Sequence, residues 1–363
     1  MFRLNPDRFD ARYGPEWLAA ATWYRENSPA VPDDPDLVLR HLDHPAVAQK
    51  IEAEFAADTR RRAAMFEALS YGSASFLLTT PGPSLSGVLL DALGTPRQRA
   101  WFRELVSTTR CRTFFAVTEP GRGSDAAHLD TTLRDGRLTG EKLLFGNGAV
   151  APVGTVLART GDGPLDLVAV LMTPELIESA AVRRRVLPMF ALPGAQLSEL
   201  RVDGLRVPPE AVLGSHLKAT ERGMMGMLKT FHRFRPGVAA MALGHAQALV
   251  DYVRDHVGAA RPELDRFDQM LERSRELNAA AAREVDEEPL RGALVSLAKQ
   301  RATAAAEEVA AVLARELPVA ALVDHPWLAR SLTDVVAYEF MEGTTPIQLA
   351  NVHAGYLRRE VPV

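Results

Sequence analysis

The stretch FFAVTEPGRGSD, residues 114–125, marks the point where the chain changes from helical to strand-like patterning. Apolar and aromatic residues followed by a turn rich in Gly and Pro predict a strand that runs into an exposed loop. Thr118 and Ser124 place hydroxyl groups in this turn, which suits a flat polar ligand or a phosphate. An ordinary β-turn explains the same spacing. Gly121 and Gly123 lack the third glycine and the βαβ context of a Rossmann fingerprint.

The pattern of apolar residues divides the chain into three segments. From about residue 15 to 105, apolar residues recur at spacings of three and four, which predicts helices. From about 112 to 215, short runs of β-branched and aromatic residues alternate with Gly, Pro and Asp, which predicts strands. From about 216 onward, long Ala-rich amphipathic runs predict closely packed antiparallel helices. We therefore expect three domains, at residues 1–112, 113–215 and 216–363.

The composition argues against several classes of protein. Apolar residues make up 47% and charged residues 24% of the 363 residues, as in a water-soluble globular protein. The net charge of -4 gives no reason to expect a nucleic acid or an anionic membrane as partner. A single cysteine, Cys111, excludes an internal disulfide framework, and the nine histidines show no metal-ligand spacing. Because the sequence shows neither a membrane span nor a signal-peptide pattern, we expect a cytoplasmic protein without a bound metal.

Two further features are compatible with binding but also have simpler explanations. The Gly-Asn-Gly sequence at residues 146–148 forms a tight turn that could face a ligand, although Asn-Gly also specifies an ordinary hairpin connection. Arginine triplets occur at residues 60–62 and 183–185. Each triplet could meet a phosphate or an acidic partner protein, or form solvated surface.

Glu342 lies in FMEGTTPIQLAN, residues 340–351, between the apolar pair Phe340 and Met341 and the following Gly343. An exposed surface position fits these neighbours poorly. A carboxylate held in an apolar pocket has a raised pKa, as a general base needs. A structural ion pair would also account for a carboxylate at this position. The residues alone therefore leave a catalytic base and an ion pair as the two hypotheses.

Taken in order, these motifs resemble those of the acyl-CoA dehydrogenase family, from about residue 65 to the end of the sequence. The first motif is similar to the family's Thr-Glu-Pro-x-x-Gly-Ser-Asp flavin turn, and the last to the segment that carries its catalytic glutamate. The resemblance implies an N-terminal all-α domain, a middle β-barrel or sandwich domain and a C-terminal four-helix bundle. The five matching segments are FAVTEPGRGSD, TTLRDGRLTGEKLLFGNGAVA, LPMFALPGAQLSELRVDGLRVPPEAVLG, FRPGVAAMALGHAQALVDY and MEGTTPIQ.

The resemblance assigns roles to particular residues. It implies that Glu342 removes the α-proton of an acyl thioester while the β-hydrogen leaves as hydride to FAD. The backbone N–H of Glu342 would then polarise the thioester carbonyl. Arg235 and Gly343, together with Ser124, would contact the substrate. The isoalloxazine ring of FAD would be bound by residues of both Gly-rich turns and of the segment after the base, namely Phe115, Val117, Thr118, Gly123, Ser124, Gly146, Asn147 and Thr344.

The chain also departs from the family pattern. Phe234 occupies the position from which some members supply their base, which leaves Glu342 without a competitor. Leu144-Phe145-Gly146 replaces the family's Trp-Ile-Thr, so a hydroxyl expected near the flavin is missing. The family's Arg-x-x-Phe-Gly and Gln-x-x-Gly-Gly motifs are absent, and Pro346 aligns with a usual glutamine. Because these elements mostly hold the adenine and pyrophosphate half of FAD, we expect this half to be bound differently.

The resemblance therefore favours an FAD-dependent dehydrogenase of an acyl thioester carried by CoA or by an acyl carrier protein. The family pattern implies a homodimer or homotetramer and an electron acceptor that the sequence does not identify. The short N-terminal domain favours compact members of secondary metabolism, such as those that oxidise hydroxyacyl- or glyceryl-carrier-protein thioesters toward polyketide extender units. One alternative is a flavin-dependent monooxygenase on the same fold, although those relatives have generally lost the glutamate. A second alternative is a non-catalytic scaffold that binds a carrier protein.

Overall fold

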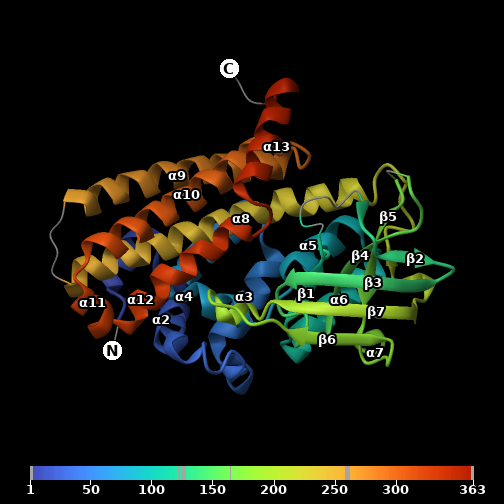
Figure 1. Cartoon of the computed structure of the whole chain (residues 1–363), viewed down its shortest axis with the longest axis horizontal. Coiled ribbons are helices and arrows are strands. Elements are labelled where there is room, and N and C mark those ends of the chain that lie inside the picture. Colours follow the sequence, from blue (N-terminus) through green and yellow to red (C-terminus); the bar gives the residue numbers. More distant parts are fainter. Residues whose placement is uncertain (1–2, 122, 124–127, 164, 258–261, 361–363) are drawn as a thin grey trace.

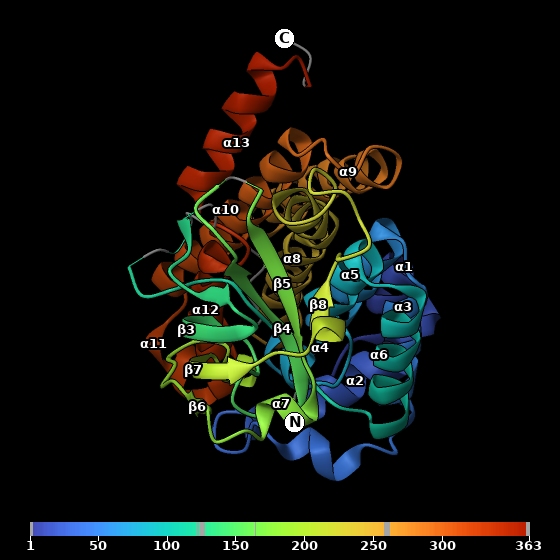
Figure 2. The ribbon, with the colours of Figure 1, turned by 90° about the vertical axis from the view of Figure 1, so that its right-hand side faces the viewer.

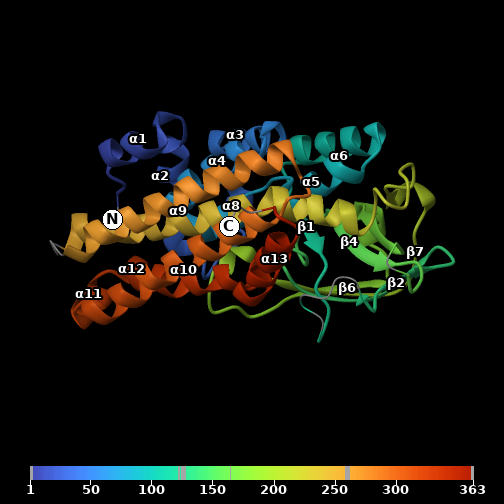
Figure 3. The same cartoon turned by 90° about the horizontal axis from the view of Figure 1, so that it is seen from above.

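The computed structural model describes residues 3–121, 123, 128–163, 165–257 and 262–360. Along the chain, a group of helices is followed by strands and then by a second group of helices, which confirms the expected architecture. Figure 1 shows the strands gathered at one end of the molecule and most of the helices at the other, and the view from above in Figure 3 shows the same arrangement.

The first helical group precedes the sheet. Its helices are α1 (Pro6–Tyr13), α2 (Leu18–Asn27), α3 (Pro45–Ala56), α4 (Thr59–Thr79), α5 (Ser84–Leu93) and α6 (Pro96–Thr109), with the 3-10 turns η1 (Pro15–Trp17), η2 (Ser28–Ala30) and η3 (Leu37–His41). Local sequence determines where α6 begins, because the side chains of Thr95 and Gln98 each bond the other's backbone N–H and Pro96 occupies the first turn. Asp58 caps α4 in a similar way by accepting from Arg61 N–H.

Among the described residues, the strands form one eight-stranded sheet in the order β6-β7-β3-β2-β4-β5-β8, and β1 pairs in parallel with β4. The strands are β1 (Thr113–Ala116), β2 (Thr132–Arg134), β3 (Arg137–Phe145), β4 (Val153–Arg159), β5 (Leu167–Met172), β6 (Val182–Val186), β7 (Ser198–Arg206) and β8 (Val212–Leu213). The short helices α7 (Pro174–Ile177), η5 (Pro193–Ala195) and η6 (Pro209–Ala211) lie between them. The apolar strands β4 and β5 are buried almost throughout, whereas the arginine-rich β6 forms an exposed edge.

The second helical group forms the C-terminal bundle. Its members are α8 (Met224–Tyr252), the π-helical turn η7 (Val253–Val257), α9 (Pro262–Glu287), α10 (Ala293–Glu316), α11 (Val319–Asp324), α12 (Pro326–Asp334), the 3-10 segment η8 (Val335–Phe340) and α13 (Thr345–Leu357). In Figures 1 and 2, α13 projects from the body of the molecule. None of the helices in the described ranges is both long enough and apolar enough to cross a membrane.

Helices α4 and α8 pack against each other at the centre of the molecule. A Cβ atom added to Gly244 would lie 2.1 Å from the carbonyl oxygen of Glu67, so only glycine permits this close approach. Three residues away on each helix, Ser70 on α4 donates a hydrogen bond to the carbonyl of Met241 at 3.0 Å. The contact joins the first helical group to the bundle and buries apolar side chains of both.

The loop at residues 192–196 connects the sheet to both helical groups. Leu192 N–H donates to the Asp334 carboxylate at 2.7 Å, which joins the loop to α12. Gly194 N–H donates to the Ser75 hydroxyl at 3.0 Å, which joins it to α4. A Cβ at Gly194 would lie 1.8 Å from the Ser75 carbonyl oxygen, so the loop requires glycine there. All three parts of the fold therefore meet at this loop.

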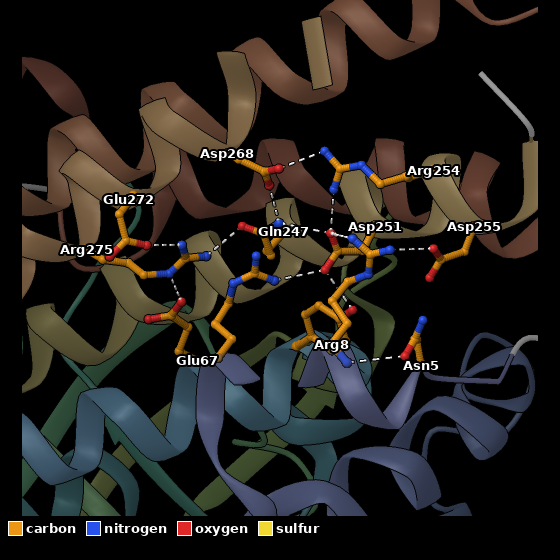
Figure 4. A network of polar contacts seen from close by, with 12 residues as sticks. Asn5, Arg8, Glu67, Gln247, Asp251, Arg254, Asp255, Asp268, Glu272 and Arg275 are labelled. Carbon is orange, nitrogen blue, oxygen red and sulfur yellow. Dashed lines mark hydrogen bonds and ion pairs between the residues drawn. The ribbon is translucent and has the colours of Figure 1, made fainter. Parts of the chain in front are cut away.

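A polar network ties α1 to the far end of α8, and Figure 4 shows Asp251 near its middle. The Asp251 side chain is buried, and its carboxylate accepts hydrogen bonds from the Tyr71 hydroxyl and the Arg12 guanidinium, both at 2.9 Å. Arg254 donates to the same carboxylate at 3.1 Å. Removal of one partner from such a buried group leaves the others uncompensated, which costs several kcal/mol.

We therefore expect Asp251→Ala to lower the free energy of unfolding by about 3 kcal/mol, because Arg12 and Arg254 lose a buried counter-charge. The matched control is Asp265→Ala, since the Asp265 side chain is 83% exposed and its ion pair within the described ranges is with Arg254. We expect the control to change stability by less than about 1 kcal/mol. Urea unfolding followed by circular dichroism measures both values, and equal losses for the two variants would contradict the assigned role of Asp251.

Candidate active site

Glu342 lies in the loop between η8 and α13, and its backbone is left-handed, with a φ of 55°. This conformation is unfavourable for residues other than glycine, so surrounding contacts have to maintain it. The Glu342 carbonyl oxygen accepts hydrogen bonds from Arg235 Nε at 3.0 Å and from Gln348 Nε2 at 2.9 Å. Gly343 follows with a φ of 101°, and a Cβ there would lie 2.8 Å from Gln348 Nε2. Hydrogen bonds thus hold the loop to α8 and α13, and position 343 has to be glycine.

The carboxyl group of Glu342 is withdrawn from water. Its Oε2 atom is buried and has no hydrogen-bond partner among the described residues. Burial raises the pKa of Glu342 to about 7, and the cations Arg235 and Lys299 act in the opposite direction through their charge. Of the apolar pair that suggested burial in the sequence, Phe340 is 70% exposed, whereas Met341 is partly buried and packs against the core. A carboxyl group in this state can accept a proton near neutral pH.

The first Gly-rich turn is anchored by a buried ion pair that the sequence patterns did not reveal. Lys142 Nζ lies 2.8 Å from Glu119 Oε1, and both side chains are buried. The Glu119 carboxylate also accepts hydrogen bonds from the backbone N–H groups of Asp130 and Thr131. Burial lowers the pKa of Lys142 to about 8, although Glu119 acts in the opposite direction. The pair holds the two ends of the segment between β1 and β2 together.

The structure places the predicted residues of this turn in different surroundings. Phe115 is buried on β1, and Val117 and Thr118 directly after the strand are half-buried. Thr118 is where the chain leaves the strand, and its carbonyl accepts a hydrogen bond from Leu143 N–H at 2.8 Å. Gly123 is exposed, and nothing lies within 4 Å of a Cβ built on it. Ser124 lies outside the described residues.

The second Gly-rich turn packs against the first helical group. Asn147 has a φ of 58°, and its Nδ2 donates to the Leu78 carbonyl at 3.0 Å, while Asn147 N–H donates to the Ala195 carbonyl at 2.9 Å. The Asn147 Oδ1 atom is buried without a partner among the described residues. The alternative interpretation of this turn as a hairpin connection is wrong, because β3 and β4 are not neighbours in the sheet. Gly146 directly precedes Asn147, and Leu144 at the end of β3 is 52% exposed.

A series of contacts connects the strand before the first Gly-rich turn with the loop that carries Glu342, which we call the base loop. The rings of Phe115 on β1 and Phe231 on α8 meet edge to face, with centroids 5.7 Å apart. The Arg235 guanidinium lies 5.4 Å from the Phe231 ring centroid, one turn further along α8, and its Nε donates to Glu342. Thr344 is the N-cap residue of α13, and its side chain forms no capping hydrogen bond. Residues predicted from three distant segments therefore gather around the N-terminal half of α8.

The arginine triplets are largely engaged in internal contacts. Arg62 is buried and donates to the Ala57 carbonyl. Arg184 donates to two backbone carbonyls of the turn before β4, and Arg185 pairs with Glu199 on the neighbouring strand β7. Interpretation of the triplets as solvated surface is therefore wrong for Arg62. Neither triplet presents three free cations to a partner.

A small cavity lies among α4, α8 and α12, next to the loop at residues 192–196. His245 lines it ten residues beyond Arg235 on α8, which corresponds to about 15 Å along the helix. Burial lowers the pKa of His245 to about 3, so this side chain is neutral. The polar side chains around the cavity are Ser28, Ser70, Ser73, Ser75, His245, Arg330, Ser331 and Asp334. Within the described ranges, no group of three or more His, Cys, Asp or Glu side chains could hold a metal ion.

Comparison with known proteins identifies the C-terminal part. Residues 221–357, which include Arg235 and the base loop, match the family described as "Acyl-CoA dehydrogenase, C-terminal domain". The C-terminal part is therefore similar to the C-terminal domain of acyl-CoA dehydrogenases. Cyclohexane-1-carbonyl-CoA dehydrogenase of Geobacter metallireducens is 32% identical over 146 residues, which are 39% of this chain and 37% of that protein. The match thus spans little more than a third of the relative's length.

Solved structures extend the likeness to the whole chain. A glutaryl-coenzyme A dehydrogenase in complex with glutaryl-CoA aligns with a TM-score of 0.79 at 21% identity, over 95% of both chains. PigA with FAD and proline aligns with a TM-score of 0.82 at 18% identity, over 99% of this chain and 100% of that one. The whole chain therefore has the acyl-CoA dehydrogenase fold.

The raised pKa of Glu342 makes stability depend on pH. The folded protein binds the Glu342 proton more tightly than the unfolded chain, whose carboxyl has the ordinary pKa of 4.5. As pH rises from about 4.5 to about 7, the wild type therefore loses stability that Glu342→Gln retains. Urea unfolding of both proteins between pH 5 and 8 measures the difference, in which all other titrating groups cancel. A difference that does not change with pH would show that the carboxyl is not buried.

Proposed function

We propose that this protein is a flavin-dependent dehydrogenase of an acyl thioester, in which Glu342 removes the α-proton. The observation that carries the proposal is the carboxyl of the half-buried Glu342, whose Oε2 is buried and unpaired among the described residues and whose pKa is raised to about 7. A left-handed backbone and a buried, unpaired carboxyl oxygen both cost free energy, as is common at catalytic sites. The similarity of the segment that carries Glu342 to the C-terminal domain of acyl-CoA dehydrogenases supports the same role.

We propose FAD as the cofactor, in line with the FAD complex of PigA, which has the same fold. The residues present are compatible with a flavin, because Oδ1 of Asn147 is buried without a partner among the described residues and the side chain of Thr344 forms no capping hydrogen bond. Phe115, Val117, Gly123 and Gly146 would complete the surroundings of the ring system. When bound, FAD supplies the acceptor for the β-hydride.

Glu342 would contribute to the reaction through two of its groups. Its carboxylate, present in about half of the molecules near pH 7, takes the proton from the carbon next to the thioester carbonyl. Its backbone N–H makes no hydrogen bond to a described residue and can donate to the thioester oxygen, where negative charge develops. Arg235 and Gly343 keep the loop in position for both contacts.

The acyl group is carried by CoA or by an acyl carrier protein, since both present the same weakly acidic α-carbon as a thioester. The glutaryl-CoA complex with the same fold supports CoA. Hydroxyacyl and glyceryl thioesters on a carrier protein are the finer proposal, which the panel of thioesters below tests. An electron acceptor then reoxidises the flavin. Exposed apolar side chains support a homodimer or homotetramer, namely Val319 and Val323 on α11 and Leu349, Tyr356 and Leu357 on α13.

The proposal predicts that an acyl thioester bleaches the flavin absorption of the FAD-loaded protein under anaerobic conditions. Glu342→Gln should lower the rate of bleaching at least about 100-fold, because the amide cannot take up the proton. The same variant should keep its FAD, since the substitution alters no proposed flavin contact. Stopped-flow absorption with a panel of acyl-CoA and acyl-carrier-protein thioesters gives the rates and identifies the carrier.

Glu276→Gln is the control for this experiment, because it makes the same chemical change at an exposed position on α9. It should bleach at the rate of the wild type. A wild-type protein that holds FAD but is bleached by no thioester in the panel would contradict the dehydrogenase proposal. If the protein instead consumed oxygen with reduced flavin, the monooxygenase alternative would replace it.

A further inference from the structure

We propose that Lys299 is a positioning residue for Glu342, because its ammonium group joins the two ends of the segment at residues 339–343. This inference rests on the proposed role of Glu342 as base. Lys299 lies on α10, and its side chain is fully buried. Its Nζ donates hydrogen bonds to the Glu339 carbonyl at 3.0 Å and to the Gly343 carbonyl at 2.8 Å. These two carbonyls stand on either side of Glu342 in the chain.

Lys299 completes a set of donors that hold this loop from three helices. Arg235 on α8 binds the Glu342 carbonyl, and Gln348 on α13 binds the carbonyls of both Glu342 and Gly343 at 2.9 Å. Each donor meets a backbone oxygen rather than the Glu342 carboxylate, so the carboxylate is left without a neutralising hydrogen bond. The loop geometry is therefore fixed while the acid–base group remains free to react.

The charge of Lys299 is expensive in this position, which argues against a role in helix packing alone. Burial lowers the pKa of Lys299 to about 8, while the facing carboxylates Glu339, Glu342 and Glu307 raise it and Arg235 lowers it further. The ammonium form nevertheless predominates at neutral pH. An apolar side chain of similar size would pack between the helices without this desolvation cost. The observed contacts of the ammonium indicate that it is retained for the loop.

Lys299 would thus act on Glu342 in two separable ways. Its hydrogen bonds restrict the loop, and its positive charge, together with that of Arg235, opposes the rise in the pKa of Glu342. Lys299→Met removes both effects at similar volume. We expect backbone amides of residues 338–348 to exchange with deuterium about tenfold faster in this variant. We also expect the Glu342 carboxyl to titrate about one pH unit higher.

The experiment measures both quantities in the full-length protein without substrate. Hydrogen–deuterium exchange with mass spectrometry reports on the loop, and infrared titration reports on the carboxyl band that disappears in Glu342→Gln. Arg301→Met is the matched control, because Arg301 is exposed on the same helix. It should change neither quantity. If Lys299→Met does not fold, Lys299→Gln replaces it, since the amide lacks the charge and is shorter.

The expected result is faster exchange and a higher titration midpoint in the Lys299 variant only. A folded Lys299 variant with wild-type exchange and a wild-type midpoint would overturn the proposal. Faster exchange spread over the whole chain, with no shift of the midpoint, would also overturn it, since it would indicate loss of stability alone. Because neither readout requires turnover, a wild-type protein inactive on thioesters would refute the proposed function without deciding the role of Lys299.

Discussion

The close approach of α4 and α8 is the constraint on which the rest of the structure depends. At Gly244 the backbone of α4 occupies the space that a methyl group would need. Any larger residue would force the helices apart, and the ring contact between Phe66 and Phe234, with centroids 5.8 Å apart, would open with them. Arg235 is the next residue on α8, so the position of its guanidinium follows from this contact. The base loop is built on that guanidinium.

The candidate site separates the groups that hold the loop from the group that reacts. Buried donors take up the loop carbonyls, and each such hydrogen bond to a charged donor contributes about 1.5 to 3 kcal/mol. The carboxyl of Glu342 receives none of this stabilisation at Oε2. The polar contacts therefore fix the backbone geometry of the loop, and packing elsewhere in the bundle offsets the cost of burying the acid. Such a division is expected where a base has to be positioned without being neutralised.

Much of the fold could be predicted from the sequence, because periodic apolar patterns report directly on burial in helices and strands. Glu342 could be singled out for a related reason, as a charge among apolar residues. The contacts between distant segments could not be predicted. Lys142 shares one face of β3 with Leu138 by strand alternation, which predicts burial but does not identify Glu119 as its partner. In the sequence, Lys299 is one of three basic residues on an amphipathic helix. Only the three-dimensional structure shows that its ammonium group contacts the base loop.

The interpretation of the Asn147 turn as a hairpin connection was wrong for a different reason. Asn-Gly predicts a local backbone shape correctly, since Asn147 is left-handed, but the shape does not determine which strands it connects. Sheet order depends on long-range pairing, which a local pattern does not contain.

The loop at residues 192–196 has a consequence for how a ligand could enter. Because this loop is bonded to Asp334 in the bundle and to Ser75 in the first helical group, the sheet cannot swing away as a hinged lid without breaking buried contacts on both sides. A ligand therefore has to enter through smaller, local displacements at the surface around the candidate site. The exposed Phe340 and the projecting α13 lie before and after the loop that carries Glu342. Because Arg235, Lys299 and Gln348 hold the loop that carries Glu342, such displacements can occur beside the base without moving it.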